Sequence, residues 1–452
     1  MKKAVIIGGG ISGLATAALL AQAGHHVTLI EKNAQLGGRA RVYKKKGYSF
    51  DMGPSWYMMP EVFDRFFALF GKKTSDFYSL IKLNPHYKVV FNPKTHAYIY
   101  DDTQKNTEVF EGIEKNAGNT LKTYLARMQK AYDIALQLLY FDTSHIRSWL
   151  SAHKIFLAIR FFFLIPFWTN WYAFTQKYFT HPHLLKILTF PAVFLGGSPY
   201  NTPALYSLLT WADFGRGIWY PKGGMTMIIR ALENLALSHN VTILTSTKVT
   251  RVLYLNNAIT HVVCGKKKTL ACDIVVNTAD LQHFETRILD QAHQTYDAAY
   301  WKKKTKAISA FIMFIGIKKR LKNATHHTLF FASDWQKNFA ALFKKTKKLY
   351  TNPSFYVAIA SATDRSIVPK AHEQLFVLVP TGAQLSTSAE QYKKYSDHIL
   401  DLLEDHYGPI RDAIDVVRIY TPHSFAQDYN AYTGTALGLA HTFLQSLFFV
   451  LH

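Results

Sequence analysis

The first forty residues constrain the fold of this chain more than any other stretch. Lys3 to Ile7 (Lys-Ala-Val-Ile-Ile) predicts a short buried strand, and residues 8 to 13 (Gly-Gly-Gly-Ile-Ser-Gly) follow it as a G-x-G-x-x-G turn. Residues 14 to 23 are rich in Ala and Leu, which favours a helix. Val27 to Ile30 predicts a second strand, with Glu31 at its carboxyl end. This order predicts a β-α-β unit that binds a dinucleotide.

The residue types in the glycine turn match the needs of a diphosphate site. Gly8 allows the tight turn out of the strand, Gly10 lets the backbone approach a pyrophosphate, and Gly13 lets the helix pack closely on the strand. Ile11 and Ser12 open the helix, where free N–H groups and the positive end of the helix dipole face the phosphates. We therefore predict that these five residues bind the diphosphate.

An acid at the end of the second strand supports the same interpretation. Glu31 lies eighteen residues after Gly13, where a carboxylate can accept a hydrogen bond from a ribose hydroxyl. A signal peptide is the competing interpretation, because Lys2 and Lys3 precede an apolar run and Ala21-Gln22-Ala23 resembles a cleavage site. Four glycines within six residues interrupt that run, which argues against a signal peptide.

A second glycine pair distinguishes FAD from NAD. Gly37-Gly38-Arg39 follows Glu31 closely and supplies both a close backbone approach and a cation for the same diphosphate. A further glycine turn lies in Phe50-Asp51-Met52-Gly53-Pro54-Ser55. An ordinary NAD dehydrogenase does not need the second pair, so the sequence favours FAD.

These motifs together resemble a known family. E-K-x-x-x-L-G-G-R-A at residues 31 to 40, followed by F-D-M-G-P-S at residues 50 to 55, resembles the FAD-dependent carotenoid desaturases of the phytoene desaturase family, among the amine-oxidase-like flavoproteins. W-x-P-x-G-G-M at residues 219 to 225 matches the same family. The resemblance implies that the cofactor is held by these further residues: Glu31, Lys32, Gly38, Arg39, Gly53, Pro54, Ser55 and, over the adenine, Val249.

The resemblance also implies an architecture. We expect an α/β protein with a doubly wound, Rossmann-like FAD-binding domain from residues 1–85 and 218–300. Residues 86–217 and 301–452 are expected to form an inserted mixed α/β substrate domain and a membrane-facing helical region. The family continues past the segment that matches Leu444-Gln445-Ser446, so we expect a flavin site that lacks its C-terminal wall and retains flavin poorly.

The most apolar run predicts contact with a membrane surface. Ile155 to Trp168 is fourteen residues long and is interrupted by Arg160 and Pro166, whereas a spanning helix needs about twenty apolar residues. Its aromatic composition favours a helix that lies in the bilayer interface, and a buried helix of the substrate domain is the alternative. The net charge of +22 suits an anionic membrane but equally suits a lysine-rich solvated surface. With two cysteines only, we expect a reduced protein at the cytoplasmic face of the membrane.

The chemistry is expected to reside in the cofactor. The sequence offers no Ser-His-Asp set, no metal-ligand spacing and no nucleic-acid motif, and Asp213, Glu233 and Asp280 are poor candidates for a catalytic base. The resemblance implies FAD-dependent desaturation of a long acyclic isoprenoid such as phytoene, with quinone or oxygen as the electron acceptor. A flavin-dependent carotenoid cis–trans isomerase, a flavin amine oxidase and an inactive truncated chain are the alternatives.

Overall fold

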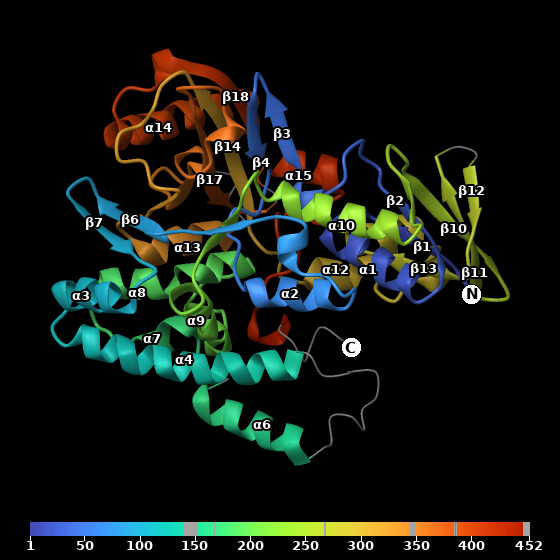
Figure 1. The fold of residues 1–452 in the computed structure, drawn as a ribbon, viewed down its shortest axis with the longest axis horizontal. Helices are drawn as coiled ribbons and strands as arrows, with labels where there is room; N and C mark the ends of the chain where they lie inside the picture. Colours follow the sequence, from blue (N-terminus) through green and yellow to red (C-terminus); the bar gives the residue numbers. More distant parts are fainter. Residues whose placement is uncertain are drawn as a thin grey trace.

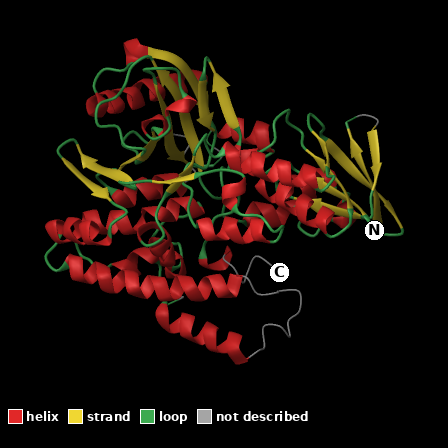
Figure 2. Ribbon diagram, in the orientation of Figure 1, coloured by secondary structure: helices red, strands yellow, loops and turns green. Residues whose placement is uncertain are grey.

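The computed structural model of the 452-residue chain describes residues 1–139, 152–166, 168–265, 268–343, 349–383, 385 and 387–445. Two positions used above lie outside the described residues, namely Phe167, within the apolar run, and Ser446. Figures 1 and 2 show three bodies: a nucleotide-binding lobe on one side, a large sheet above, and a helical body below.

A parallel sheet forms the centre of the nucleotide-binding lobe. In spatial order its strands are β13 (Ile274–Asn277), β1 (Lys3–Ile7), β2 (His26–Ile30) and β9 (Thr242–Leu244). Both faces are buried, because Ala4 and Ile6 pack under helices while Val5 and Ile7 pack on the opposite side. The covering helices are α1 (Ile11–Gln22) and α10 (Thr226–Ser238). The predicted α/β class with a parallel nucleotide-binding sheet is confirmed.

The second face of this sheet is covered by strands. They are β10 (Val249–Leu255), β11 (Ala258–Cys264) and β12 (Lys268–Ala271), which form an antiparallel sheet. The sequence from Thr269 to Val276 predicts a single strand, and this prediction is wrong, since the chain changes sheets at Cys272 and Asp273. The Cys272 N–H donates to Thr260 O at 2.8 Å, whereas the Asp273 N–H donates to Lys3 O at 2.8 Å.

A seven-stranded sheet forms the second body. In spatial order its strands are β18 (Ile414–Tyr420), β14 (Ser309–Ile317), β17 (Glu373–Thr381), β16 (Phe355–Ala358), β15 (His327–Phe330), β6 (Tyr87–Asn92) and β7 (Thr95–Ile99). One face, with Phe311 and Met313, packs on α14 (Ala389–Tyr407). The other face, with Ile312 and Phe314, closes over the helical body, so the sheet forms one side of the largest apolar core (Figure 1).

The helical body lies below the sheet (Figure 2). Its helices are α3 (Thr103–Ile113), α4 (Ala117–Leu139), α6 (Ala152–Leu164), α7 (Trp171–Thr175), α8 (Pro182–Thr189) and α9 (Leu209–Phe214). The sequence from Leu184 to Leu195 predicts one helix, but α8 ends at Thr189 and the chain continues as a 3₁₀ turn over Phe190–Leu195. Pro191 explains the break, because it lacks the N–H that an α-helix needs at that position.

Shorter elements connect the three bodies. They are β3 (Val42–Lys45), β4 (Tyr48–Asp51), α2 (Pro60–Ala68), β5 (Leu80–Lys82), β8 (Trp219–Pro221), α11 (Leu281–His283), α12 (Ala298–Lys303), α13 (Trp335–Phe343) and α15 (Pro422–Tyr429). β5 pairs with β8 where the chain leaves the nucleotide-binding lobe and where it returns. Residues 57–85 predict a helical segment that becomes polar, and the helical prediction is wrong beyond α2, where β5 follows. The domain boundaries near residues 85 and 218 stay a prediction.

Candidate cofactor pocket

A cavity of about 470 Å³ opens at the carboxyl ends of β1 and β2. This is the edge at which parallel α/β sheets bind nucleotides. The predicted site residues that line it are Gly8, Gly10, Ile11, Ser12, Glu31, Lys32, Gly38, Arg39, Pro54 and Val249. The fold therefore brings together residues from five separate stretches of the chain around one cavity.

The glycines around the cavity leave room for a ligand. A Cβ at Gly13 would stand 1.9 Å from Gly8 O, so Gly13 permits the packing of α1 against β1. At Gly10 the nearest atom to such a Cβ is Gly38 Cα at 4.0 Å, and both glycines line the pocket. Side chains at these two positions would fill the space that a diphosphate needs, so the cradle fits a dinucleotide.

Glu31 is buried and rigidly held at the pocket wall. Its Oε2 accepts a hydrogen bond from the Gly9 N–H at 2.8 Å, and its Oε1 accepts from the N–H of Asn33 at 2.8 Å and from Asn33 Nδ2 at 2.9 Å. Since a carboxylate has about four acceptor positions, lone pairs remain for ribose hydroxyls. The side chain is oriented before any ligand arrives.

Cations surround the mouth of the pocket. Arg39 is exposed, and its guanidinium carbon lies 5.7 Å from the centre of the Tyr429 ring. Lys32 Nζ donates to Gln427 O at 2.8 Å and to Asn430 Oδ1 at 3.0 Å. Burial lowers the pKa of Lys32, although nearby Glu31 opposes that shift. Arg39 is thus positioned to reach a diphosphate, while Lys32 also holds a C-terminal segment.

The segment after β18 supplies a wall that the sequence analysis did not predict. Asp428, Tyr429, Asn430 and Gly438 line the pocket. Arg41 Nη2 donates to Asp428 Oδ2 at 2.6 Å and fixes this segment to the nucleotide-binding lobe. The expectation that the flavin site lacks its C-terminal wall concerns the family segment beyond Leu444-Gln445-Ser446, so it stays a prediction.

The turn after β13 was also missed as part of the site. Asn277, Thr278, Ala279 and Asp280 line the pocket, and Thr278 Oγ1 donates to Ile7 O and Gly8 O, each at 3.0 Å. The signal lay in the topology. Residues 273–276 resemble the family's strand that returns to the nucleotide-binding sheet, and a polar turn at the end of a neighbouring parallel strand must face the same edge.

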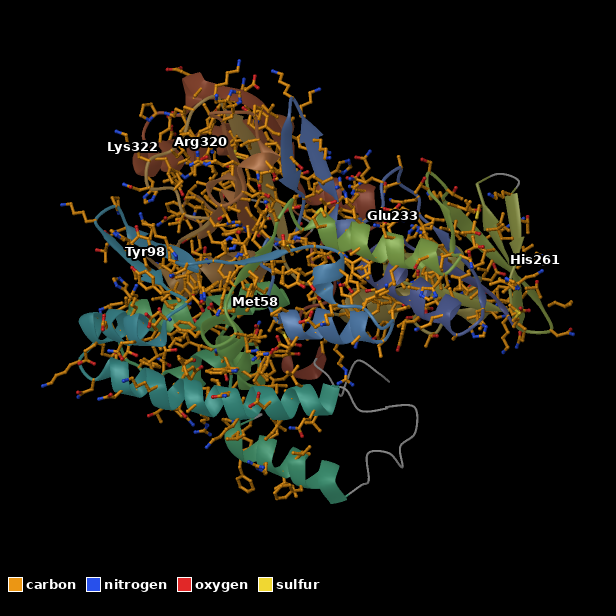
Figure 3. All side chains as sticks on the ribbon, in the orientation of Figure 1. Met58, Tyr98, Glu233, His261, Arg320 and Lys322 are labelled. Atoms are coloured by element: carbon orange, nitrogen blue, oxygen red, sulfur yellow. The ribbon has the colours of Figure 1, made fainter. Side chains whose placement is uncertain are left out.

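Three predicted residues do not line the pocket. Gly13 lies beneath the turn, and a Cβ at Gly53 would stand 2.3 Å from Arg39 O, so Gly53 permits the two motif turns to touch. Ser55 instead lies 2.9 Å from the hydroxyl of Tyr356 in the large sheet. Met58, close to Ser55 in the chain, lies near the centre of the molecule in Figure 3. This turn therefore leads from the pocket toward the sheet.

The three acids that are poor candidates for a catalytic base lie in different parts of the structure. Asp280 lines the pocket, and its carboxylate accepts from the N–H of His283 at 2.9 Å and of Tyr432 at 3.2 Å, which gives it a structural role. Glu233 lies on α10 (Figure 3), and Asp213 is buried on α9; neither is among the pocket-lining residues.

Comparison with known proteins identifies the family. The family described as flavin containing amine oxidoreductase matches residues 11–448. A carotenoid 3,4-desaturase of Haloarcula japonica is 37% identical over 98% of this chain and 88% of its own length. A zeta-carotene-forming phytoene desaturase of Myxococcus xanthus is 29% identical over 98% of this chain and 85% of its own length.

Solved structures share the fold. An oxidoreductase from Methanosarcina mazei covers 93% of this chain and 88% of its own, with a TM-score of 0.61 and 17% identity. The structure of putrescine oxidase bound to putrescine covers 92% of this chain and 84% of its own, with a TM-score of 0.56 and 14% identity. The family match over residues 11–448 and the glycine cradle agree with these similarities in sequence and in fold. The chain belongs to the flavin containing amine oxidoreductases, within their carotenoid and phytoene desaturase-like branch, and is an FAD-dependent oxidoreductase.

Proposed function

We propose that this enzyme desaturates a carotenoid or an acyclic carotenoid precursor such as phytoene. The observation that carries the proposal is the 37% identity, over 98% of the chain, to a carotenoid 3,4-desaturase. A zeta-carotene-forming phytoene desaturase, 29% identical over 98% of the chain, supports the same class of substrate.

The chain's own residues have defined tasks in this proposal. Gly8, Gly10, Gly38 and Arg39 hold the diphosphate, and Glu31 holds the ribose. FAD held there would supply the oxidising power for the removal of two substrate hydrogens. Aromatic side chains pack around Trp56 next to the cofactor pocket and would exclude water there; they are Tyr87, Phe190, Phe194 and Tyr356.

Product analysis tests the proposed function. The purified chain is incubated with FAD and either phytoene or lycopene, and products are separated and measured by absorbance. Desaturation adds conjugated double bonds and moves the absorbance to longer wavelength, whereas isomerisation leaves the number of double bonds unchanged. Recovery of only geometric isomers would favour the isomerase and contradict desaturation. Repeating the assay with a quinone, with and without oxygen, identifies the acceptor.

Peripheral binding at the cytoplasmic face of a membrane is the second part of the proposal. Helix α6 lies at the outer edge of the helical body (Figure 1), with Phe163 76% exposed, and the nearby Trp168 is 69% exposed. Arg127 donates to the carbonyls of Phe163 and Leu164 at the end of α6, at 3.2 and 2.6 Å. Satisfying these carbonyls lowers the cost of placing the helix end in lipid. Within the described residues, no helix combines the length and apolarity needed to cross a bilayer.

Sedimentation with anionic liposomes tests this binding. Phe163→Ser with Trp168→Ser should reduce pelleting, and salt should weaken only the lysine-dependent part. The matched control replaces Leu237 and Leu255, exposed leucines of the nucleotide-binding lobe, by Ser. Phe161 is unsuitable for this test, because it is 6% exposed and belongs to the core. Equal pelleting of the two double variants would contradict the proposal.

A further inference from the structure

A hydrogen-bonded series of side chains starts beside the cofactor pocket and enters the core. Pro54 lines the pocket, and Oγ of the next residue, Ser55, lies 2.9 Å from the Tyr356 hydroxyl. That hydroxyl lies 2.6 Å from Nδ1 of His327. Trp56 stacks on the His327 ring, with centroids 4.5 Å apart and planes 11° apart. The motif turn is thereby linked to the middle of the seven-stranded sheet.

A second polar group leads from the core to the surface. His86 is completely buried, with Nε2 3.6 Å from Asp101 Oδ1 and Nδ1 3.8 Å from Asp213 Oδ1. Both separations are slightly longer than a direct hydrogen bond. Asp101 is partly exposed and pairs with Lys82 at 2.6 Å. His86 therefore connects the interior with a solvated ion pair.

The two groups meet around one aromatic ring and leave polar atoms without partners. Trp56 packs against Tyr87 as well as His327, and the Tyr87 hydroxyl donates to Asp213 Oδ2 at 2.7 Å. Of the described residues in these two groups, the buried atoms without a hydrogen-bond partner are His327 Nε2, both ring nitrogens of His86, and Asp213 Oδ1. A buried polar atom of this kind destabilises the fold unless something satisfies it. Convergent polar atoms of this kind are where buried water is held.

We propose that Ser55, Tyr356, His327 and His86 form a path that carries a proton from the cofactor side to Asp101, with buried water between the two imidazoles. The inference rests on the proposed desaturation. When a CH–CH unit becomes C=C, the second hydrogen leaves as a proton and its bonding pair becomes the π bond. In an apolar interior that proton needs a polar exit, which this series provides.

The protonation states of the two histidine rings suit the transfer of a proton rather than its retention. Burial lowers the pKa of His86 to about 4 and that of His327 well below its ordinary value, so both rings are neutral at pH 7. His327 faces His326 and His86, and His86 faces Asp101, Lys82 and Asp213. Outward transfer requires Tyr356 to donate to His327 Nδ1, which leaves the Nε2–H of His327 facing the gap.

Tyr356→Phe is the sharpest variant, because it removes one oxygen and retains the ring. We expect kcat to fall about 10²-fold or more with KM unchanged, and the solvent deuterium isotope effect to increase. Tyr48→Phe is the matched control, because the Tyr48 hydroxyl lies 2.8 Å from His372 Nδ1 in another Tyr–His pair of the core. Wild-type kinetics in Tyr356→Phe, or a loss without a larger isotope effect, would overturn the path.

A second measurement does not depend on turnover. Nitrogen NMR of histidine-labelled protein should show His327 as the Nε2–H tautomer, and Tyr356→Phe should shift its Nδ1 signal while Tyr48→Phe leaves it unchanged. The opposite tautomer would overturn the outward path. If wild-type protein desaturates nothing, the proposed function fails, and this spectrum still decides whether the series has the required polarity.

Discussion

Two glycines of the same turn have different tasks, and alanine substitutions separate them. Gly13→Ala places a Cβ 1.9 Å from Gly8 O, so we expect lower stability, by about 1–3 kcal/mol or more, together with loss of FAD. Gly10→Ala meets nothing closer than 4.0 Å, so the protein should fold with nearly unchanged stability but bind FAD poorly. Thermal unfolding without cofactor and fluorescence titration with FAD measure the two effects. Equal stability losses in both variants would contradict this division.

Asp213 should make stability depend on pH. Burial raises the pKa of its carboxyl from 3.8 to about 7, so the folded protein binds a proton more tightly than the unfolded chain. Stability therefore falls as the pH rises from about 4 to 7. Asp213→Asn removes the ionisation. The gain in its free energy of unfolding over that of the wild type should therefore be absent near pH 4 and reach up to about 4 kcal/mol at pH 8. Urea unfolding at both pH values checks this, with exposed Asp133→Asn on α4 as the control.

At the scale of elements, Asp51 joins two motifs that are far apart in sequence. Its Oδ2 accepts from the Met225 N–H at 3.0 Å and so caps α10 from outside the helix. Helix α10 in turn contacts the cofactor turn, because a Cβ at Gly37 would stand 3.2 Å from Ile229. The acid of F-D-M-G-P-S thus orients the helix that follows W-x-P-x-G-G-M.

Removing this cap should affect both stability and cofactor affinity. Asp51→Ala should cost about 1 kcal/mol of stability and weaken FAD binding about fivefold through the loosened α10. The control is Asp102→Ala, which removes the cap of α3, where Asp102 Oδ1 accepts from the Gln104 N–H at 2.8 Å. Calorimetry should show similar stability losses but unchanged FAD affinity in the control. Unchanged FAD affinity in Asp51→Ala would contradict the coupling.

Local signals predicted some elements and not others. The β-α-β unit was predictable, because strand, glycine turn, helix and acid are all contained in Lys3 to Glu31. The division of residues 269–276 between two sheets was not, since it depends on which distant carbonyls the N–H groups of Cys272 and Asp273 reach. Likewise, both faces of α6 are apolar, so periodicity could not tell that Phe161 is buried while Phe163 is exposed.

At the scale of the whole molecule, one segment ties the large sheet to the nucleotide-binding lobe. Strand β18 belongs to the seven-stranded sheet, and α15 follows it directly to the pocket. Tyr420, at the end of β18, donates to Asp428 Oδ2 at 2.7 Å, and Arg41 donates to the same oxygen at 2.6 Å. The sequence could not predict this connection, because Arg41 and Asp428 are 387 residues apart.

Breaking this connection should release the cofactor more than it destabilises the fold. Asp428→Ala removes two hydrogen bonds to a partly buried carboxylate, so the segment should lose about 1–3 kcal/mol of its hold on the lobe and FAD affinity should fall about tenfold. Burial alone would raise the pKa of Asp428, but the bonds from Tyr420 and Arg41 outweigh burial and lower it. The contribution of these hydrogen bonds is therefore complete at neutral pH and is lost only as the pH falls below about 4.

FAD dissociation followed by fluorescence at pH 7 measures the effect of Asp428→Ala. Asp415→Ala is the matched control, because Asp415 also lies on β18 and pairs with Lys46 at 2.9 Å without lining the pocket. Equal FAD release from the two variants would show that the segment's hold on the lobe does not govern cofactor retention.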